Sequence, residues 1–269
     1  MDATVTAVTR RWSTPEPGRF HPHWHRMPEH RFAFGLAAGA GRMGLAARHL
    51  DFPILDVGCG DCALHARLRE AGWVGTYVGL DANPAPDPAL VSDDDIAAGR
   101  AILRQVDFET MYRLPIDGRD ERAYEAAFCV QVIEHLPRVK QGFLVAEMRR
   151  VAKRVVVTTP NRLYTGAVSA GGHLTRPEHV GLLSLEELAS LMGDGVEVGR
   201  VNWNGVDARG RGWPMLSSTD ETAADLWGLW VTPELRRRRS AIPLVRGVYD
   251  REHPGEGPGT LGGLVRAEG

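Results

Sequence analysis

The chain has 269 residues, enough for one full-sized core together with an appended lid or subdomain. Its 43% hydrophobic and 25% charged residues are ordinary for a globular protein, and no apolar run approaches the ~20 residues needed to cross a bilayer. A formal net charge of −2 argues against a general electrostatic footprint for nucleic acid. Three cysteines are too few for a disulfide framework, and the N-terminus lacks the apolar segment of a secretory signal. We therefore expect a cytoplasmic protein with no membrane partner.

The first fifty residues predict an irregular arm followed by a helix. Residues 13–30 are rich in proline and histidine, and helical spacing follows from about Arg31 to Leu50, where four glycines loosen it. Three alternating histidines of the arm could bind a metal, although such an arm more often covers a site without ligating anything; they are His21, His23 and His25.

From residue 52 onwards, apolar runs alternate with segments of helical spacing. This alternation predicts an α/β fold with a doubly wound, Rossmann-like, mostly parallel sheet of about seven strands and helices on both faces. Ser184 and Glu187 form a capping-box pattern that opens one of the helices. The expected strands are 52–58, 75–81, 101–109, 126–131, 153–161 and 195–203, and the expected helices are 61–73, 143–152 and the segment after Ser184.

The residues after 205 break this rhythm. The stretch 208–258 contains three tryptophans and the arginine run Arg236 to Arg239, which could touch a phosphate group but more often marks a solvated helix face. We expect this stretch to be an insertion that covers the site, with Trp227 and Trp230 in the core or lid and a last edge strand in 259–268. The expected division is an arm and helix over 1–50, a cofactor-binding core over 51–205, and the lid with the last strand of the same domain over 206–269.

A glycine turn follows the first predicted strand. Gly58 and Gly60 stand where a tight turn and close backbone approach to a ligand both require missing side chains. Asp81 ends the next strand about 20 residues on, where a carboxylate can hold both hydroxyls of a ribose, although it could also be a simple turn former. The pattern predicts a nucleotide-containing cofactor at this edge of the sheet.

Asp56 distinguishes between two cofactor classes. Gly58-x-Gly60-x-x-Ala63 also satisfies the relaxed dinucleotide fingerprint, so an NAD-dependent oxidoreductase is one alternative. A carboxylate two residues before the first glycine would repel a pyrophosphate, whereas it would attract a ligand that carries an ammonium and a sulfonium. S-adenosylmethionine (SAM) is such a ligand, and the charge of Asp56 favours it.

The motifs "ILDVGCGDC", "YVGLDANP", "QVDFE", "QVIEHLP" and "RVVVTTPN" resemble, in order and spacing, the class I SAM-dependent methyltransferases, over residues 52–203. The chain is most similar to the ubiquinone-pathway and small-molecule O-methyltransferase type. This resemblance implies SAM as cofactor and methyl transfer to a small-molecule acceptor, at oxygen in preference to nitrogen or carbon. The residues that it assigns to the cofactor are Asp56, Gly58 and Gly60 at the methionine moiety, Asp81 and Ala82 at the ribose, Asp107 and Phe108 at the adenine, and Gln131 near the sulfonium.

Two residues of these motifs have other interpretations. Cys62 stands where many members of the family have a third glycine, and Cys59-x-x-Cys62 could be a redox or metal pair, although no second pair completes a zinc site. Asp107 could be a turn residue at a strand end.

Glu134 and His135 begin the loop or helix beyond the fourth core strand, on the side where a methyl acceptor must lie. The ordinary histidine pKa of about 6.5 suits His135 to take the proton of an acceptor hydroxyl, with Glu134 orienting it. "EHLP" could also be a helix-start signature, with Glu134 favoured by the helix dipole.

A third interpretation of this segment is metal binding. In small-RNA 2′-O-methyltransferases and ubiquinone-pathway O-methyltransferases, a related Glu-x-x-Glu-His pattern holds a divalent ion. Here Gln131 replaces the first glutamate, and we expect no metal; the candidates for one would be Glu134, His135 and His179. Beside the small-molecule enzyme, the alternatives that stay open are an RNA 2′-O-methyltransferase, the NAD-dependent oxidoreductase and a non-catalytic cofactor-binding module.

Overall fold

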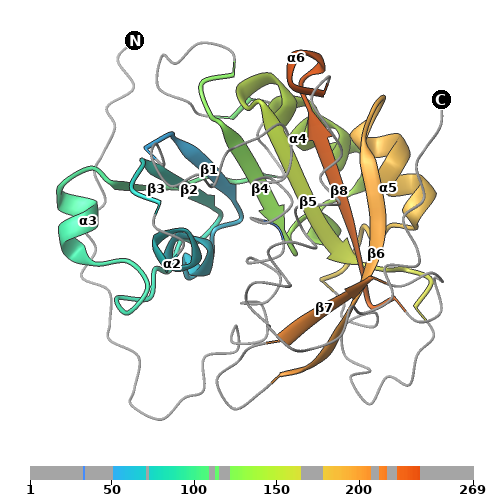
Figure 1. Ribbon diagram of the computed structural model, residues 1–269, viewed down its shortest axis with the longest axis horizontal. Coiled ribbons are helices and arrows are strands. Elements are labelled where there is room, and N and C mark those ends of the chain that lie inside the picture. Colours follow the sequence, from blue (N-terminus) through green and yellow to red (C-terminus); the bar gives the residue numbers. More distant parts are fainter. Residues whose placement is uncertain are drawn as a thin grey trace.

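The computed structural model describes residues 33, 51–70, 73–108, 113–114, 122–164, 178–206, 212–216 and 223–236 (Figure 1). These residues form one eight-stranded sheet of order β3-β2-β1-β4-β5-β8-β6-β7. Within these ranges, no helix combines the length and the apolar character that a membrane span requires. The strands are β1 (Ile54–Val57), β2 (Tyr77–Asp81), β3 (Ala101–Gln105), β4 (Ala126–Val130), β5 (Arg154–Pro160), β6 (Glu197–Val206), β7 (Gly212–Leu216) and β8 (Asp225–Val231).

The first five strands are parallel and confirm the predicted Rossmann-like, mostly parallel sheet. β1 lies between β2 and β4, with Val57 opposite Leu80 and Cys129, so the carboxyl ends of these strands meet at one edge. β4 pairs with β5 in the same direction. The residues that follow β1, β2, β3 and β4 therefore gather at a single edge of the sheet, as parallel strands with crossover helices require.

The other half of the sheet differs from the sequence expectation. Residues 225–231, which fall in the predicted insertion, form β8, a strand that is buried along its whole length and antiparallel to both β5 and β6. β7 pairs with β6 at the outer edge and raises the strand number to eight. The apolar sequence "DLWGLWV" is a continuous buried run because neighbouring strands and both layers of the fold cover it.

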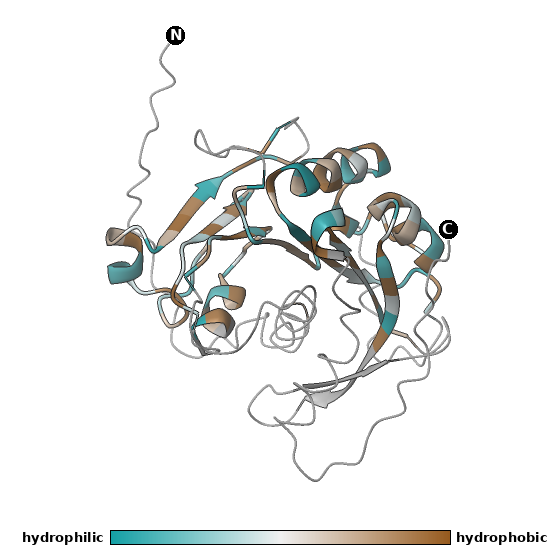
Figure 2. Ribbon diagram, turned by 45° about the horizontal axis from the view of Figure 1, so that its top comes forward, coloured by the Kyte–Doolittle hydropathy of each residue, from teal (hydrophilic) through white to brown (hydrophobic). Residues whose placement is uncertain are grey.

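Helices cover both faces of the sheet, as Figure 2 shows with apolar strands between helices of mixed colour. The helices are α2 (Ala63–Glu70), α3 (Asp93–Ala97), the 3₁₀ turn η2 (Ile133–His135), α4 (Arg138–Val151), α5 (Leu185–Met192) and α6 (Pro233–Arg236). Leu64 and Leu68 of α2 pack in one core cluster with Trp227, whereas α4 and α5 pack in the other with Trp230. Both tryptophans are thus core residues, on opposite faces of β8.

The predicted capping box of α5 is confirmed. Ser184 Oγ accepts from the backbone N–H of Glu187 at 3.3 Å, and the Glu187 carboxylate accepts from the backbone N–H of Ser184 at 2.6 Å. The predicted helix 31–50 lies outside the described residues, apart from the buried helical Ala33. His21, His23, His25, residues 237–239 and the predicted last strand 259–268 also lie outside them.

Candidate functional site

The glycine turn has the backbone shape that the sequence predicts. Gly58 and Gly60 have φ values of +78° and +50°, in the region that favours glycine. A Cβ on Gly58 would lie 2.1 Å from Val132 Cγ2, so this glycine lets the segment after β4 approach the turn. A Cβ on Gly60 would meet no heavy atom of the described residues within 4 Å. Among these residues, the turn is therefore closely packed at Gly58 and has open space at Gly60.

The Asp81 carboxylate is held by two backbone N–H groups. Gly60 N donates to Oδ2 at 2.9 Å, and Asn83 N donates to Oδ1 at 2.8 Å. The loop after Asp81 is joined to the glycine turn, because Ala85 N donates to Gly60 O and Asp87 N donates to Asp61 O, both at 3.1 Å. The ends of β1 and β2 thus form one unit in which the carboxylate has a fixed orientation. Ala82 is exposed next to it.

Asp56 is buried beneath the same turn, with 2% of its surface exposed. Burial raises its pKa to about 7; the hydrogen bond from Tyr77 Oη at 2.5 Å opposes this rise, and the charges of Asp81 and Asp61 add to it. The side chain of Asp56 therefore points into the layer between the sheet and α2, where it accepts a hydrogen bond from Tyr77.

The two cysteines of the turn are structural. Cys59 and Cys62 are free and buried, and Cys62 takes the left-handed φ of +68° at the position where many members of the family have glycine. A hydrogen bond with Cys62 and burial raise the pKa of the Cys59 thiol well above its usual range. Among the described residues, neither cysteine belongs to a group of three possible metal ligands, and a thiol held protonated, as at Cys59, is a poor redox nucleophile.

Beyond β3, Asp107 and Phe108 stand at the same edge of the sheet. Val106 N donates to Asp81 O at 2.8 Å, which brings this segment beside the end of β2. Asp107 is exposed, whereas Phe108 is buried in the core cluster on the α4 side of the sheet. The two neighbours therefore have different surroundings: one carboxylate is accessible and one ring is packed.

Glu134 and His135 lie together in η2, directly after β4. Glu134 is 1% exposed, and its Oε2 accepts from Thr159 Oγ1 at 3.3 Å. His135 Nδ1 lies 3.2 Å from the carbonyl oxygen of Glu178, and because a carbonyl only accepts, Nδ1 carries the proton in this contact. Nε2 of the neutral ring then has the lone pair, 4.0 Å from Glu134 Oε1.

The segment after residue 177 completes this cluster with His179. The rings of His135 and His179 are 4.9 Å apart in an edge-on arrangement. Glu134, His135 and His179 form the one group of three possible metal ligands in the part of the chain that the structure describes, with ligand atoms within 4.8 Å of one another. The three residues that the sequence selects as metal candidates are thus brought together.

Two further residues of the site were missed by the sequence analysis. Gln141 of α4 donates through Nε2 to the carbonyl oxygens of Ile133 (2.9 Å) and Gly181 (2.6 Å), which fastens η2 to the His179 segment. Asp225, the first residue of β8, accepts from Gln131 Nε2 at 3.4 Å. No motif marks either residue; the polar Gln141 inside an otherwise apolar helix face was the one available signal.

Residues 55–155, which include the glycine turn, Asp81, Gln131 and η2, match the family model described as a methyltransferase domain. The protein is a SAM-dependent methyltransferase, with its methyltransferase domain over these residues. The methyl donor is therefore SAM. Of the alternatives that the sequence left open, the NAD-dependent oxidoreductase and the non-catalytic cofactor-binding module are not supported.

Several solved structures are similar to the methyltransferase. A SAM-dependent methyltransferase from Archaeoglobus fulgidus has 15% identity and a TM-score of 0.45, with 66% of this chain and 85% of that chain covered. The magnesium protoporphyrin IX methyltransferase from Synechocystis PCC 6803 has 14% identity and a TM-score of 0.45, with 79% and 89% covered. The small RNA methyltransferase HEN1 has 16% identity and a TM-score of 0.49, with 77% and 26% covered. Among curated proteins, none matches the chain.

Proposed function

We propose that the protein transfers the methyl group of SAM to a hydroxyl oxygen of a small molecule, with His135 as the general base. The observation that carries this proposal is the orientation of the His135 ring. Its Nδ1 donates a hydrogen bond to the Glu178 carbonyl oxygen, so Nε2 has the lone pair that can accept the proton of a hydroxyl. The ring stands at the end of β4, and 33% of the side chain is exposed, which leaves it accessible to an acceptor.

The glycine turn and its partners are the proposed cofactor seat. SAM, when bound, supplies an activated methyl group on a positively charged sulfur. The residues present fit this cofactor: the open side of Gly60 admits a ligand, and the Asp81 carboxylate is already oriented for the two ribose hydroxyls. We place Asp56, Gly58 and Gln131 on the methionine side, and Asp107 and Phe108 at the adenine.

Glu134 has a supporting role in the proposed proton transfer. As the acceptor oxygen bonds to the methyl carbon, its proton moves to His135 Nε2, and the carbon–sulfur bond breaks with its electron pair left on sulfur. The imidazolium that results has a buried carboxylate 4.0 Å away, which stabilises the positive charge in a low-dielectric setting. A nitrogen acceptor with a free lone pair would not need this base, which is why the arrangement favours oxygen.

The proposal is tested with labelled SAM and matched pairs of phenols and anilines, followed by nuclear magnetic resonance of the product to locate the methyl group. We expect methylation at oxygen, and we expect His135→Gln to lower the turnover number by about 100-fold while SAM affinity stays unchanged. The pH dependence of the remaining rate should lose the limb that reports deprotonation of the base. Methylation of anilines alone, or full activity of the variant, would refute the base.

A small-molecule acceptor of the ubiquinone-pathway type is favoured over RNA by charge. The proposed acceptor side carries the buried carboxylate of Glu134, and the whole chain has a formal net charge of −2. Carboxylates repel a phosphate backbone. Short RNA oligonucleotides belong in the acceptor panel, and their methylation in preference to the phenols would contradict this part of the proposal.

A divalent ion at the metal-candidate cluster is the second candidate for how the acceptor is activated. Glu134, His135 and His179 offer a carboxylate and two imidazoles, a set that suits a borderline ion such as zinc, and the Nδ1 contact of His135 to a carbonyl is typical of metal-bound histidine. A bound ion would lower the pKa of the acceptor hydroxyl. Metal analysis of the purified protein, with and without a chelator, separates this mechanism from the metal-free base.

A further inference from the structure

Gln131 and Asp225 form a buried polar pair that joins the end of β4 to the start of β8. The Gln131 amide donates to the Asp225 carboxylate at 3.4 Å across 94 positions of sequence. The exposed fractions of the two residues are 7% and 6%. A buried amide and a buried carboxylate are costly to desolvate, so a pair of this kind indicates either a fold requirement or a site requirement.

The backbone of Gln131 favours a site requirement. Its φ is +56°, a left-handed conformation that a residue with a long side chain adopts only when its surroundings impose it. Two contacts impose it here: Gln131 N donates to Thr158 O at 3.0 Å, and the side chain is held by Asp225. The left-handed turn takes the chain out of the strand at the edge where the cofactor seat is proposed.

The pair also fixes which way the amide faces. The amide nitrogen of Gln131 is the end that faces Asp225, because Nε2 donates to Oδ1. β8 lies two strands from β4 on one side, and β1 with its glycine turn lies next to β4 on the other. Because Nε2 is directed at the carboxylate of β8, the other end of the planar amide, Oε1, is directed away from that carboxylate. In the sheet, β1 lies on the opposite side of β4 from β8.

We propose that Asp225 is a positioning residue for methyl transfer, which holds the Gln131 amide so that Oε1 faces the sulfonium of SAM. This inference rests on the proposed cofactor seat at the glycine turn. An amide oxygen attracts the positive sulfonium of the substrate and has no such attraction for the neutral sulfur of the product, S-adenosylhomocysteine. Asp225 therefore makes the site prefer the charged methyl donor, which limits inhibition by the product.

The test is a comparison of SAM and S-adenosylhomocysteine binding by calorimetry, because the two ligands differ only in the methyl group and the charge. We expect Asp225→Ala to weaken SAM binding about fivefold to tenfold relative to S-adenosylhomocysteine binding, as for the loss of one hydrogen-bond-like contact to a charged group. Asp225→Asn still offers an oxygen to the Gln131 amide, so it should keep most of the preference. The ratio of two dissociation constants in one variant cancels any general loss of folded protein.

A double-mutant cycle shows whether Asp225 acts through Gln131. Gln131→Leu should lower the preference by itself, and Asp225→Ala should change it no further in that background. Thr158→Val is the matched control, because it keeps the backbone oxygen that contacts Gln131 N and removes a buried hydroxyl that has no hydrogen-bond partner among the described residues. The ligand preference of this variant should equal that of the wild type.

Other outcomes overturn the inference. Equal weakening of both ligands by Asp225→Ala would make Asp225 merely structural. Additive effects in the double variant would mean that its charge acts on the sulfonium directly. A wild-type protein that binds neither ligand would refute the proposed cofactor seat itself, which is a different result from an unchanged preference with intact binding.

Discussion

Two carboxylates at the ends of neighbouring strands are placed in opposite physical environments. Asp56 is desolvated and shares a short hydrogen bond with Tyr77, so its charged form is disfavoured. Asp81 accepts two backbone N–H groups at the edge of the sheet, where its side chain is partly accessible. At the scale of single residues, the environment of Asp81 suits a carboxylate that accepts hydrogen bonds from ligand hydroxyls. The environment of Asp56 suits a buried carboxyl group that packs beneath the turn.

Asp81→Ala should weaken SAM binding by about 10- to 100-fold, because a carboxylate that accepts from two ribose hydroxyls contributes two charge-assisted hydrogen bonds. Calorimetry measures the change. Asp87→Ala is a matched control, since it removes the same charge from the same loop, where its carboxylate accepts from Ala89 N. Equal losses in both variants would mean that only the net charge of the loop matters.

Asp56 should make the free energy of unfolding depend on pH. The pKa of Asp56 is about 7 in the folded protein, above the ordinary 3.8. Its contribution to the free energy of unfolding is therefore fully present below about pH 4 and is lost as the pH rises to about 7. The loss amounts to about 4 kcal/mol. Urea unfolding of the wild type and Asp56→Asn measures it: the difference in stability between them should fall across this window and then level off. A constant difference would contradict the buried, protonated carboxyl.

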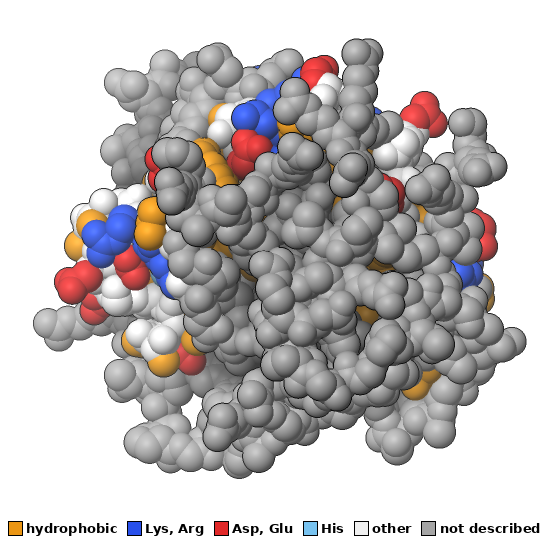
Figure 3. Space-filling model, viewed as in Figure 1, with side chains coloured by type: hydrophobic (Ala, Val, Ile, Leu, Met, Phe, Trp, Pro, Cys, Tyr) orange, Lys and Arg blue, Asp and Glu red, His pale blue; other side chains and the backbone are white. Residues whose placement is uncertain are grey.

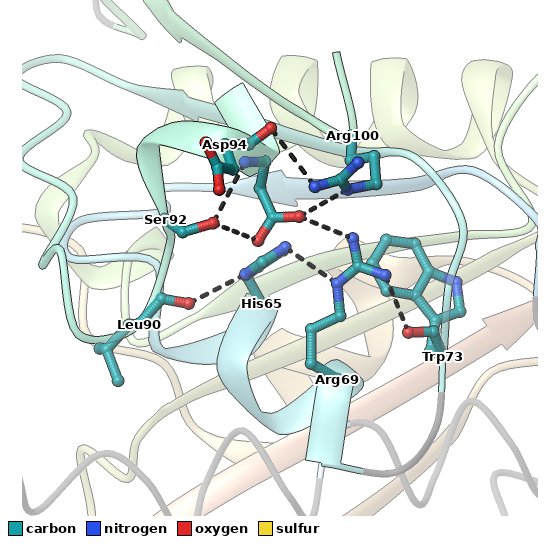
Figure 4. A network of polar contacts seen from close by, with 8 residues as sticks. His65, Arg69, Trp73, Leu90, Ser92, Asp94 and Arg100 are labelled. Carbon is teal, nitrogen blue, oxygen red and sulfur yellow. Dashed lines mark hydrogen bonds and ion pairs between the residues drawn. The ribbon is translucent and has the colours of Figure 1, made fainter. Parts of the chain in front are cut away.

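At the scale of elements, α2 and α3 are joined by a polar network that includes Arg100, just before β3 (Figure 4). Asp95 accepts from Arg69 of α2 at 3.4 Å and from Arg100 at 2.7 Å, and Ser92 caps α3. Figure 3 shows charged side chains of both signs at the left end of the molecule, where α3 lies, and others along the top and the right edge. The network fixes the connection between β2 and β3, which carries the loop after Asp81, so its integrity bears on the cofactor seat.

His65 is the pH-sensitive member of this network. Its ring contacts Leu90 O through Nδ1 at 3.0 Å and accepts from Arg69 Nε through Nε2 at 3.4 Å, which requires the neutral form. Burial, the largest cause, and the charge of Arg69 lower its pKa, against the Leu90 contact and the charge of Asp95. Since the folded pKa lies below 6.5, this contribution to stability is complete above pH 6.5 and is lost as the pH falls through the folded value.

The free energy of unfolding of His65→Gln should therefore lack the decrease on acidification that His65 causes in the wild type. Urea unfolding between about pH 5 and 7.5 should show the advantage of the wild type over this variant shrinking as the pH falls, the reverse of the trend expected for Asp56. Measuring each variant against the wild type separates the two opposed effects. An advantage that grows on acidification would mean that the His65 ring is charged in the folded protein.

At the scale of the whole molecule, β8 is part of the core and not of a cover. All seven of its residues are buried, with Leu226 and Trp230 on one face and Trp227 and Leu229 on the other. Each large apolar side chain of this kind contributes about 1.5–3 kcal/mol on burial. Their sum is comparable to the whole stability of a domain, about 5–15 kcal/mol.

A chain that ends at residue 222 should therefore fail to fold. A missing lid would leave a cooperative unfolding transition and SAM binding in place, whereas a missing strand between β5 and β6 should abolish both. Circular dichroism during thermal unfolding and calorimetry with SAM measure the two properties. A truncated chain that keeps a cooperative transition would show that the sheet closes without β8.

The sequence predicts the parallel half of the fold well, because β1 to β5 are apolar runs at regular spacing. It also predicts the tight turn after β1, where Gly58 and Gly60 have positive φ values. It does not predict β8, since nothing in "DLWGLWV" says that this segment returns to lie between two strands made earlier. Asp225 was missed for the same reason. The grouping of His135 with His179 depends on Gln141, whose contacts no spacing rule describes.

The position of β8 has a consequence for the order in which the protein forms. Strands β1 to β5 leave the ribosome in sequence and can pair as they appear, but β6 cannot join them, because its neighbour in the sheet is synthesised after it. The hairpin of β6 and β7 must wait for residue 231 before it can dock. Asp225 belongs to β8, so a nascent chain has every residue of the proposed methionine side only after this strand has been made.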